Sequence, residues 1–180
     1  SDTFKTTYTY PFMSSATGCS YLYDNLFYIQ PIAVRRDRNG KYAGEEITTY
    51  RKLSNGKYVE DAYIQYQSAS VADTVVRYVS YTPTCALQTY KGKDGQQIRL
   101  LWGWNDCYLL GKAVGTESRS FSFNTRQMFD QSALQDAFKS YRNSNPSLLV
   151  TSYSYNLLGD VTSITQPNGN MNYYEYENDY

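Results

Sequence analysis

The side chains best suited to catalysis in this sequence are three pairs of closely spaced carboxylates. They are Glu45 and Glu46, Glu60 and Asp61, and Glu175 and Glu177. A glycosidase needs two such groups about 5–10 Å apart around a bound sugar. Adjacent residues of a strand point to opposite faces, so the first two pairs are not expected to share a substrate. Glu175 and Glu177 share a face near the end of the chain, where solvated edge charges that discourage strand pairing are the favoured interpretation. A glycosidase fragment is the remote alternative.

Other common catalytic and metal-binding groups are missing or unsuitably spaced. The chain contains no histidine, which removes the Ser-His-Asp arrangement, Cys-His nucleophiles and histidine-based metal sites. Its three cysteines, Cys19, Cys85 and Cys107, form no Cys-x-x-Cys motif, so structural zinc is not expected. Cys85 and Cys107 can pair if their strands adjoin, but free buried thiols are favoured. The sequence therefore predicts no enzyme, no cofactor and no metal site.

The charge pattern argues against nucleic-acid binding, and the length of the apolar stretches argues against a transmembrane helix. The 17 basic and 17 acidic residues cancel, and no basic stripe is visible that would displace counterions from phosphates. No stretch approaches the roughly 20 apolar residues that a transmembrane helix needs. With 41% hydrophobic and 19% charged residues, the 180-residue chain is typical of one globular domain, or of one domain and a fragment of a repeat array.

Tyrosine and turn dipeptides indicate the elements that position these side chains. The chain has 21 tyrosines, a residue that favours pleated, half-buried surfaces. Four dipeptides suited to tight hairpin turns separate alternating apolar and polar runs. They are Asn39-Gly40, Asn55-Gly56, Asp94-Gly95 and Asn168-Gly169. The predicted fold is mainly β, an antiparallel meander of hairpins.

Trp102 and Trp104 are the candidate ligand-contacting aromatics. Their alternation with Ile98 and Leu100 predicts one shared strand face. Two neighbouring indoles can form a flat platform for a sugar ring. The favoured alternative is that both lie in the core beneath a helix, where each would bury about 150–250 Å².

One segment has helical spacing. Apolar side chains at Leu134, Phe138 and Tyr141 predict an amphipathic helix over about 130–142. Ser132, three residues before Gln135, is expected to form a capping box at its start, and Asn143 and Pro146 are expected to end it. Such a short helix needs a sheet to cover.

The last thirty residues form a repeat. Tyr153 and Tyr155 recur after 21 residues as Tyr174 and Tyr176. A turn with Gly159 and a turn with Pro167 and Gly169 separate these strands. A period of this length is typical of arrays in which each unit packs against its neighbours. We therefore expect the final strand, about 171–177, to present an open edge for a further hairpin or to fray.

This segment resembles the YD repeat of the RHS family. In that pattern a Tyr-x-Tyr-Asp strand, a Gly-Arg turn and an Asp-Pro-x-Gly turn follow one another. Here Asn156 stands in place of the first Asp, Gly159-Asp160 in place of Gly-Arg, and Gln166-Pro167-Asn168-Gly169 in place of Asp-Pro-x-Gly; Glu177 replaces the second Asp. Upstream, Leu101-Trp102-Gly103-Trp104-Asn105 is similar to the Trp-Gly-Tyr-Asn block that precedes such repeats. The likeness covers about residues 85–180.

The resemblance implies a non-catalytic structural or interaction scaffold, part of a large secreted or cell-envelope protein. It implies a β-rich lead-in domain over 1–149 and a truncated YD-repeat hairpin over 150–180. The implied partners are neighbouring repeats of the parent chain and, further, carbohydrate or a cell-surface protein. A carbohydrate-binding module that uses exposed aromatics is the alternative function. The chain begins at Ser1-Asp2 without a signal segment, and we expect it to be a piece of a longer polypeptide.

Overall fold

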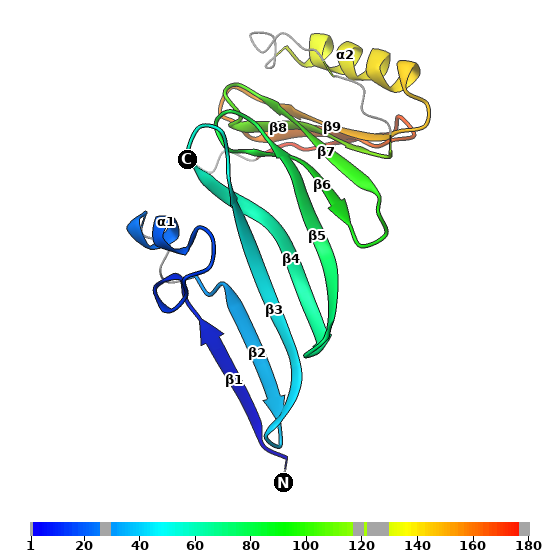
Figure 1. Cartoon of the computed structure of the whole chain (residues 1–180). Coiled ribbons are helices and arrows are strands. Elements are labelled where there is room, and N and C mark those ends of the chain that lie inside the picture. Colours follow the sequence, from blue (N-terminus) through cyan, green and yellow to red (C-terminus); the bar gives the residue numbers. More distant parts are fainter. Residues whose placement is uncertain (1, 26–29, 117–120, 122–129, 177–180) are drawn as a thin grey trace. The chain divides into compact units, whose positions relative to one another are not determined.

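The computed structural model describes residues 2–25, 30–116, 121 and 130–176 (Figure 1). Its strands follow one another in the sheet in chain order, from β1 to β11. They are β1 (Phe4–Thr9), β2 (Ala33–Arg38), β3 (Lys41–Lys52), β4 (Tyr58–Ser68), β5 (Val71–Tyr81), β6 (Leu87–Gly92), β7 (Gln97–Gly103), β8 (Tyr108–Val114), β9 (Leu149–Tyr155), β10 (Val161–Thr165) and β11 (Met171–Tyr173). The helices are the 3-10 turn η1 (Pro11–Met13), α1 (Cys19–Asp24) and α2 (Gln131–Ser144). The prediction of a mainly antiparallel β meander with one substantial helix is confirmed.

All four predicted turn dipeptides connect consecutive strands. Asn39 and Gly40 have φ of 53° and 74°, the left-handed pair that a two-residue hairpin requires. Gly56, Gly95 and Gly169 have φ of 84°, 76° and 87° at the corresponding points of their turns. Because a side chain is disfavoured at positive φ, these glycines fix where each strand reverses.

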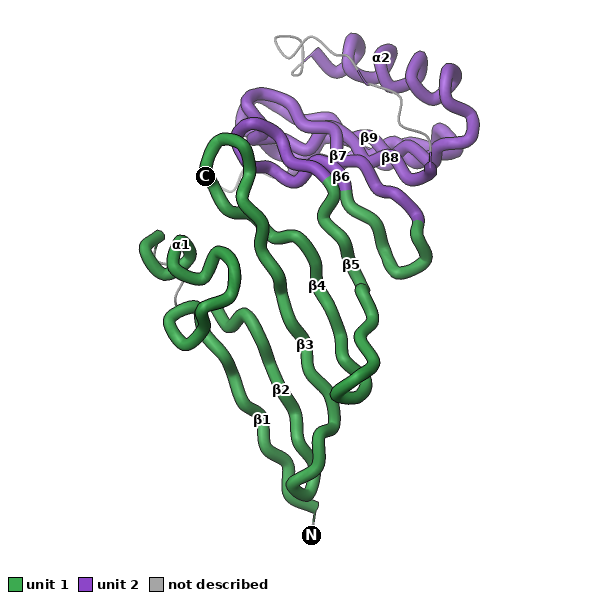
Figure 2. Tube along the Cα trace, in the orientation of Figure 1, with its two compact units in different colours: residues 1–79, 90–95 green, residues 80–89, 96–180 purple. Residues whose placement is uncertain are grey.

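The chain divides into two compact units (Figure 2). Unit 1 comprises residues 1–79 and 90–95, and unit 2 comprises 80–89 and 96–180. The 150–180 segment lies within unit 2, where β9 pairs with β8 (Gly111 opposite Ser152) and with β10. The predicted domain boundary between residues 149 and 150 was placed at the start of the sequence repeat, and it stays a prediction.

Unit 1 contains long, ladder-paired strands and a small core. Cys19, Leu22 and Ile32 form its buried cluster, with Tyr50 packed against it. Gly18 has φ of 87°, and a Cβ there would lie 2.9 Å from a ring atom of Tyr58. This glycine therefore both begins α1 and lets the helix approach the strands.

Unit 2 has a larger core, formed where α2 covers the sheet. Its buried residues are Leu101, Leu110, Ala113, Leu134, Phe138, Tyr141, Leu148, Val150 and Tyr155. Phe138, fully buried, comes so close to β8 that a Cβ at Gly111 would lie 2.5 Å from its ring. A glycine at 111 thus sets how closely the helix packs on the strand.

The start and end of α2 differ from the sequence-based expectation. Asp130 is the N-cap, and its Oδ1 accepts a hydrogen bond of 3.1 Å from the Ala133 amide, so the predicted cap at Ser132 is wrong. Ser132 lies inside the first turn. The helix runs through Asn143, and Asn145 caps its end by donating from Nδ2 to the Tyr141 carbonyl. Both Asp and Ser are good N-caps, and the capping-box pattern favoured the wrong one.

Candidate functional site

The two tryptophans do not share a strand face. Trp102 is a half-buried residue of β7, and its Nε1 donates to the Leu87 carbonyl at 2.7 Å. β7 ends at Gly103, and Trp104 lies in the turn that follows, with φ of 42°. Since the chain leaves extended conformation there, the period of two that predicted a common face no longer applies.

Neither tryptophan belongs to the core beneath α2, so the favoured interpretation of both as core residues is wrong. The core side chain of this segment is Leu101, which alternates with Trp102 along β7. Trp104 is 52% exposed and stacks in parallel on Tyr108, with ring centroids 5.9 Å apart and planes 7° apart. The exposed indole therefore rests on a second aromatic ring.

The turn that carries Trp104 has an unusual backbone. Trp104, Asn105 and Asp106 are three consecutive non-glycine residues with φ of 42°, 51° and 64°. A non-glycine residue in this conformation costs about 1–3 kcal/mol, so it persists only where the surrounding structure holds it. The Thr84 hydroxyl donates to Asp106 Oδ2 and so links this turn to the one after β5.

The first Tyr-x-Tyr pair is structural. Tyr155 is 8% exposed, its hydroxyl donates to the Leu109 carbonyl at 2.7 Å, and its ring meets Tyr108 edge-on at 5.0 Å. Burial raises the pKa of Tyr155 to about 12. Tyr153 packs against the same core. The pair therefore joins β9 to β8.

The turn after Tyr155 is fixed by Asn156. Its Oδ1 accepts from the Leu158 and Asp160 amides, both at 2.9 Å, and its Nδ2 donates to the Asp160 carboxylate. Gly159 has φ of 92°, and a Cβ there would lie 2.7 Å from the Tyr108 hydroxyl. Asn156 and Gly159 thus hold the turn against the aromatic cluster.

The second Tyr-x-Tyr pair is much more exposed. β11 ends at Tyr173, so Tyr174 and Tyr176 lie beyond the strand and are 43% and 54% exposed. The Tyr174 amide still donates to the Thr162 carbonyl, and the Tyr176 hydroxyl donates to the Val161 carbonyl. The expected strand over 171–177 is therefore shorter, and residue 177 lies outside the described residues.

Two of the candidate carboxylates have cationic partners. Glu46 accepts from Arg36 at 2.6 Å, and this hydrogen bond holds the pKa of Glu46 below its ordinary value. Asp61 forms ion pairs with Arg51 at 3.3 Å and Arg77 at 3.7 Å. Both carboxylates are thus ion-pair partners on the strands, while Glu177 lies outside the described residues.

The three cysteines differ in accessibility. Cys19 is buried, Cys85 is half-buried and Cys107 is exposed, and none of the three forms a disulfide bond. The expectation of buried thiols is therefore wrong for Cys107. Across the described parts of the chain, no three acidic or cysteine side chains come together to hold a metal ion. No helix in those parts is long and apolar enough to cross a membrane.

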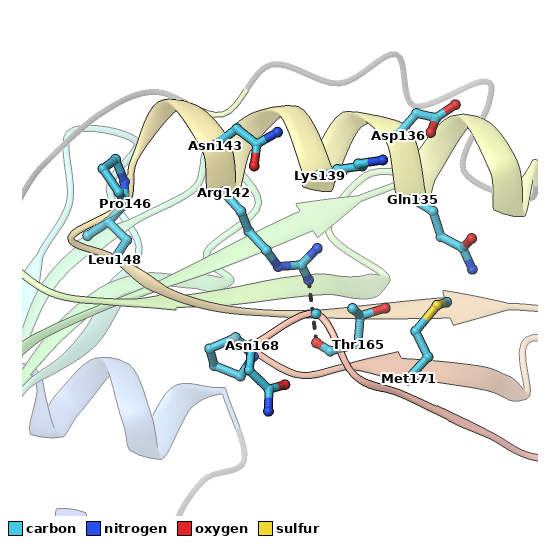
Figure 3. A pocket seen from close by; sticks show the side chains of 12 residues that line it. Gln135, Asp136, Lys139, Arg142, Asn143, Pro146, Leu148, Thr165, Asn168 and Met171 are labelled. Atoms are coloured by element: carbon cyan, nitrogen blue, oxygen red, sulfur yellow. Dashed lines mark hydrogen bonds between the residues drawn. The ribbon is translucent and has the colours of Figure 1, made fainter.

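A cleft of unit 2 lies between α2 and the hairpin of β10 and β11 (Figure 3). Its volume is about 910 Å³. The helix contributes Gln135, Asp136, Lys139, Arg142 and Asn143, the connection contributes Pro146 and Leu148, and the hairpin contributes Thr165, Pro167, Asn168, Gly169 and Met171. Pro167 and Gly169 were predicted from the sequence as turn residues, but no sequence pattern indicated that they line a cleft.

Arg142 is the central side chain of this cleft. Nε donates to the Val150 carbonyl at 3.0 Å, and Nη2 donates to Ser152 Oγ at 2.7 Å and to the Thr165 carbonyl at 3.4 Å. These bonds tie α2 to β9 and β10. Burial lowers the pKa of Arg142. Its role was not visible in the sequence, because Arg142 reads as an ordinary cation in the last turn of a helix.

Comparisons with known proteins add no relative. No protein-family model matches the chain, and no curated protein sequence matches it.

Proposed function

We propose that this chain is a non-catalytic scaffold segment of a secreted or cell-envelope protein of the RHS/YD-repeat type, built to continue its sheet by adding strands. The meander order supports this proposal, since each strand pairs with the next one in the chain. So does the placement of the two Tyr-x-Tyr segments on β9 and around β11, with β10 between them.

The observation that carries the proposal is the edge formed by β11. It is the last strand in the order of the described sheet, and it pairs with β10 through Ser163 opposite Tyr173 and Thr165 opposite Met171. Tyr173 is 70% exposed. An exposed edge with an aromatic row is a template for a further strand.

The hydrogen-bond pattern shows which amides the edge offers. The Gln166 amide bonds to the Asn170 carbonyl and the Tyr174 amide to the Thr162 carbonyl. Because bonded and non-bonded pairs alternate in an antiparallel ladder, the amides of Met171 and Tyr173 face away from β10. In the proposed role, the Tyr173 amide bonds to the next repeat. Tyr173 stands 21 residues after Ser152, which pairs with Thr165 of β10, whereas Met171 stands 21 residues after Val150, which lies beyond the paired residues of β9 and β10.

The test is an extended chain in which a second copy of residues 156–176 is inserted directly after Tyr176. This insertion keeps the 21-residue period and supplies the next hairpin in register. The Tyr173 amide should become protected from hydrogen exchange, while the Asn172 amide changes little. A scrambled insertion of the same composition is the control. Equal exchange at Tyr173 in both chains would refute the scaffold role.

A second candidate function, carbohydrate binding, is favoured by Trp104. Its 52% exposed indole, stacked on Tyr108 and held on a backbone-strained turn, has the form of a sugar-stacking platform. Titration with neutral oligosaccharides, followed by calorimetry, tests it. Binding should be lost in Trp104→Ala and kept in Trp102→Phe; loss in both or in neither would count against a site at Trp104.

A further inference from the structure

The cleft beneath α2 gathers cationic and amide groups from one helix face. Gln135, Lys139 and Arg142 follow one another at helical spacing, so they line the same side of α2. In the close view, Gln135 and Arg142 extend from the helix toward the hairpin, and Asp136 is directed away from it (Figure 3). The carboxylate of the cleft wall is therefore turned away from Arg142.

Arg142 is a half-buried cation whose bonding partners are all neutral. They are two backbone carbonyls and a serine hydroxyl, and Nη1 takes no part in these bonds. None of the ion pairs between described residues involves Arg142 or Lys139. A desolvated cation without a counter-ion is unfavourable, and an anion placed beside Nη1 would offset that cost.

The remaining walls indicate what else the ligand carries. The Gln135 and Asn168 amides and the Thr165 hydroxyl can exchange hydrogen bonds with hydroxyl groups. Leu148, Pro167 and Met171 supply apolar surface between them. A ring with C–H faces, hydroxyls and one acidic group matches this combination.

We infer that this cleft binds the carboxylate or sulfate group of an acidic saccharide, with Arg142 and Lys139 contacting the anion. The inference does not depend on strand addition at β11 or on stacking at Trp104. A uronic acid and a sulfate ester present the same anionic chemistry, and the experiment separates them.

The test uses the full chain in buffer of low ionic strength, with three probes of similar size. They are a galacturonic acid trisaccharide, a sulfated galactose trisaccharide and a neutral galactose trisaccharide. Binding is followed by calorimetry and by the amide signals of Thr165 and Gly169. One or both acidic probes should bind and shift the Thr165 and Gly169 signals, and the neutral probe should leave these signals unchanged; which acidic probe shifts them identifies the source of the anion.

Variants locate the binding. Lys139→Gln should weaken the binding of the acidic probe about tenfold, as expected for loss of one charge-assisted hydrogen bond. Lys57→Gln, which removes an exposed cation from unit 1, is the matched control and should change nothing. Arg142→Lys keeps the positive charge but loses the guanidinium group, whose N–H donors reach β9 and β10. The variant should therefore weaken binding while the chain stays folded.

Three results would overturn the inference. The first is that neither acidic probe shifts the Thr165 and Gly169 signals, and the second is that the neutral probe shifts them equally. The third is equal affinity in Lys139→Gln and the parent chain. None of these results bears on the exchange of the Tyr173 amide, so this inference and the proposed scaffold role fail separately.

Discussion

Units 1 and 2 use the same antiparallel hairpins but gain stability from different sources. In unit 1, β3 and β4 are 12 and 11 residues long, and most of their side chains are only half-buried. In unit 2, β7 to β9 are each 7 residues long and lie under α2, around a cluster of nine buried side chains. The long strands of unit 1 compensate for a thin core by extending the ladder.

The two units also differ in what their charged side chains bond to. Ion pairs run along the strands of unit 1, among them Arg36 with Glu46 and Arg51 with Asp61. Such exposed pairs contribute about 0–1 kcal/mol each. In unit 2 the notable cation, Arg142, bonds instead to backbone carbonyls under the helix. Deleting buried side chains should therefore damage unit 2 far more than similar deletions on the strands of unit 1.

The largest effect is expected at Phe138, which is fully buried. Phe138→Ala should lower the free energy of unfolding of unit 2 by about 3–5 kcal/mol, because it removes contacts and leaves a cavity. Urea denaturation followed by tryptophan fluorescence reports unit 2, since both tryptophans lie there. Phe4→Ala, at a residue of β1 that is 72% exposed, is the control; it is followed by far-ultraviolet circular dichroism, because unit 1 contains no tryptophan, and should stay within about 0.5 kcal/mol. Similar costs at both positions would remove the distinction between the units.

A smaller effect is expected at Gly111. The Cβ of Gly111→Ala would lie 2.5 Å from the Phe138 ring and 3.0 Å from the Thr151 carbonyl. Relieving that overlap by shifting α2 should cost about 1–3 kcal/mol in the same denaturation experiment. Gly92→Ala is the comparison in unit 1 and is followed by far-ultraviolet circular dichroism; there the added methyl meets only the flexible Asp94 side chain, at 3.1 Å. Unchanged stability of Gly111→Ala would show that the helix does not pack so closely.

The cap of α2 provides the next test. Asp130→Ala should cost about 1 kcal/mol, because the Ala133 amide loses its acceptor. Ser132→Ala should be neutral or slightly stabilising, since alanine is the better residue inside a helix. A larger loss of stability for Ser132→Ala than for Asp130→Ala would instead support the capping box predicted from the sequence.

The last comparison concerns alkaline pH and tests the two units directly. Burial raises the pKa of Tyr50 in unit 1 and of Tyr155 in unit 2 to about 12. The folded state then holds protons that the unfolded state releases near pH 10, so both units should lose stability between about pH 10 and 12. Tyr50→Phe and Tyr155→Phe should each flatten this loss in their own unit, measured by near-ultraviolet dichroism and tryptophan fluorescence. A loss of equal slope in the variants would assign the effect to other groups.

Local signals in the sequence were sufficient for the hairpins and for α2. Asn-Gly and Asp-Gly dipeptides specify tight reversals through backbone preference alone, and the spacing of Leu134, Phe138 and Tyr141 specifies a helix with one buried face. These features depend on neighbours in the chain, so they could be read without the structure. The turn at Trp104 could not, because three non-glycine residues at positive φ have no local signature.

The cleft beneath α2 escaped prediction for a similar reason. Arg142 acquires its role from Val150, Ser152 and Thr165, which reach it only after β9 and β10 have paired. The Tyr-x-Tyr repeat predicted two equivalent segments, yet Tyr155 is 8% exposed and its counterpart Tyr176 is 54% exposed. That difference arises from position in the sheet, since β9 has a strand on both sides and β11 lies at the edge.

The central claim, that the β11 edge receives a further repeat, is tested most directly by the thermal unfolding of unit 2. The chain extended by a second copy of residues 156–176 is compared with the chain that carries the scrambled insertion, both followed by tryptophan fluorescence. In repeat proteins each added neighbour contributes interface free energy, so the extended chain should unfold about 3–6 °C higher. Equal midpoints for the two insertions would mean that β11 is a finished edge, and would contradict the account.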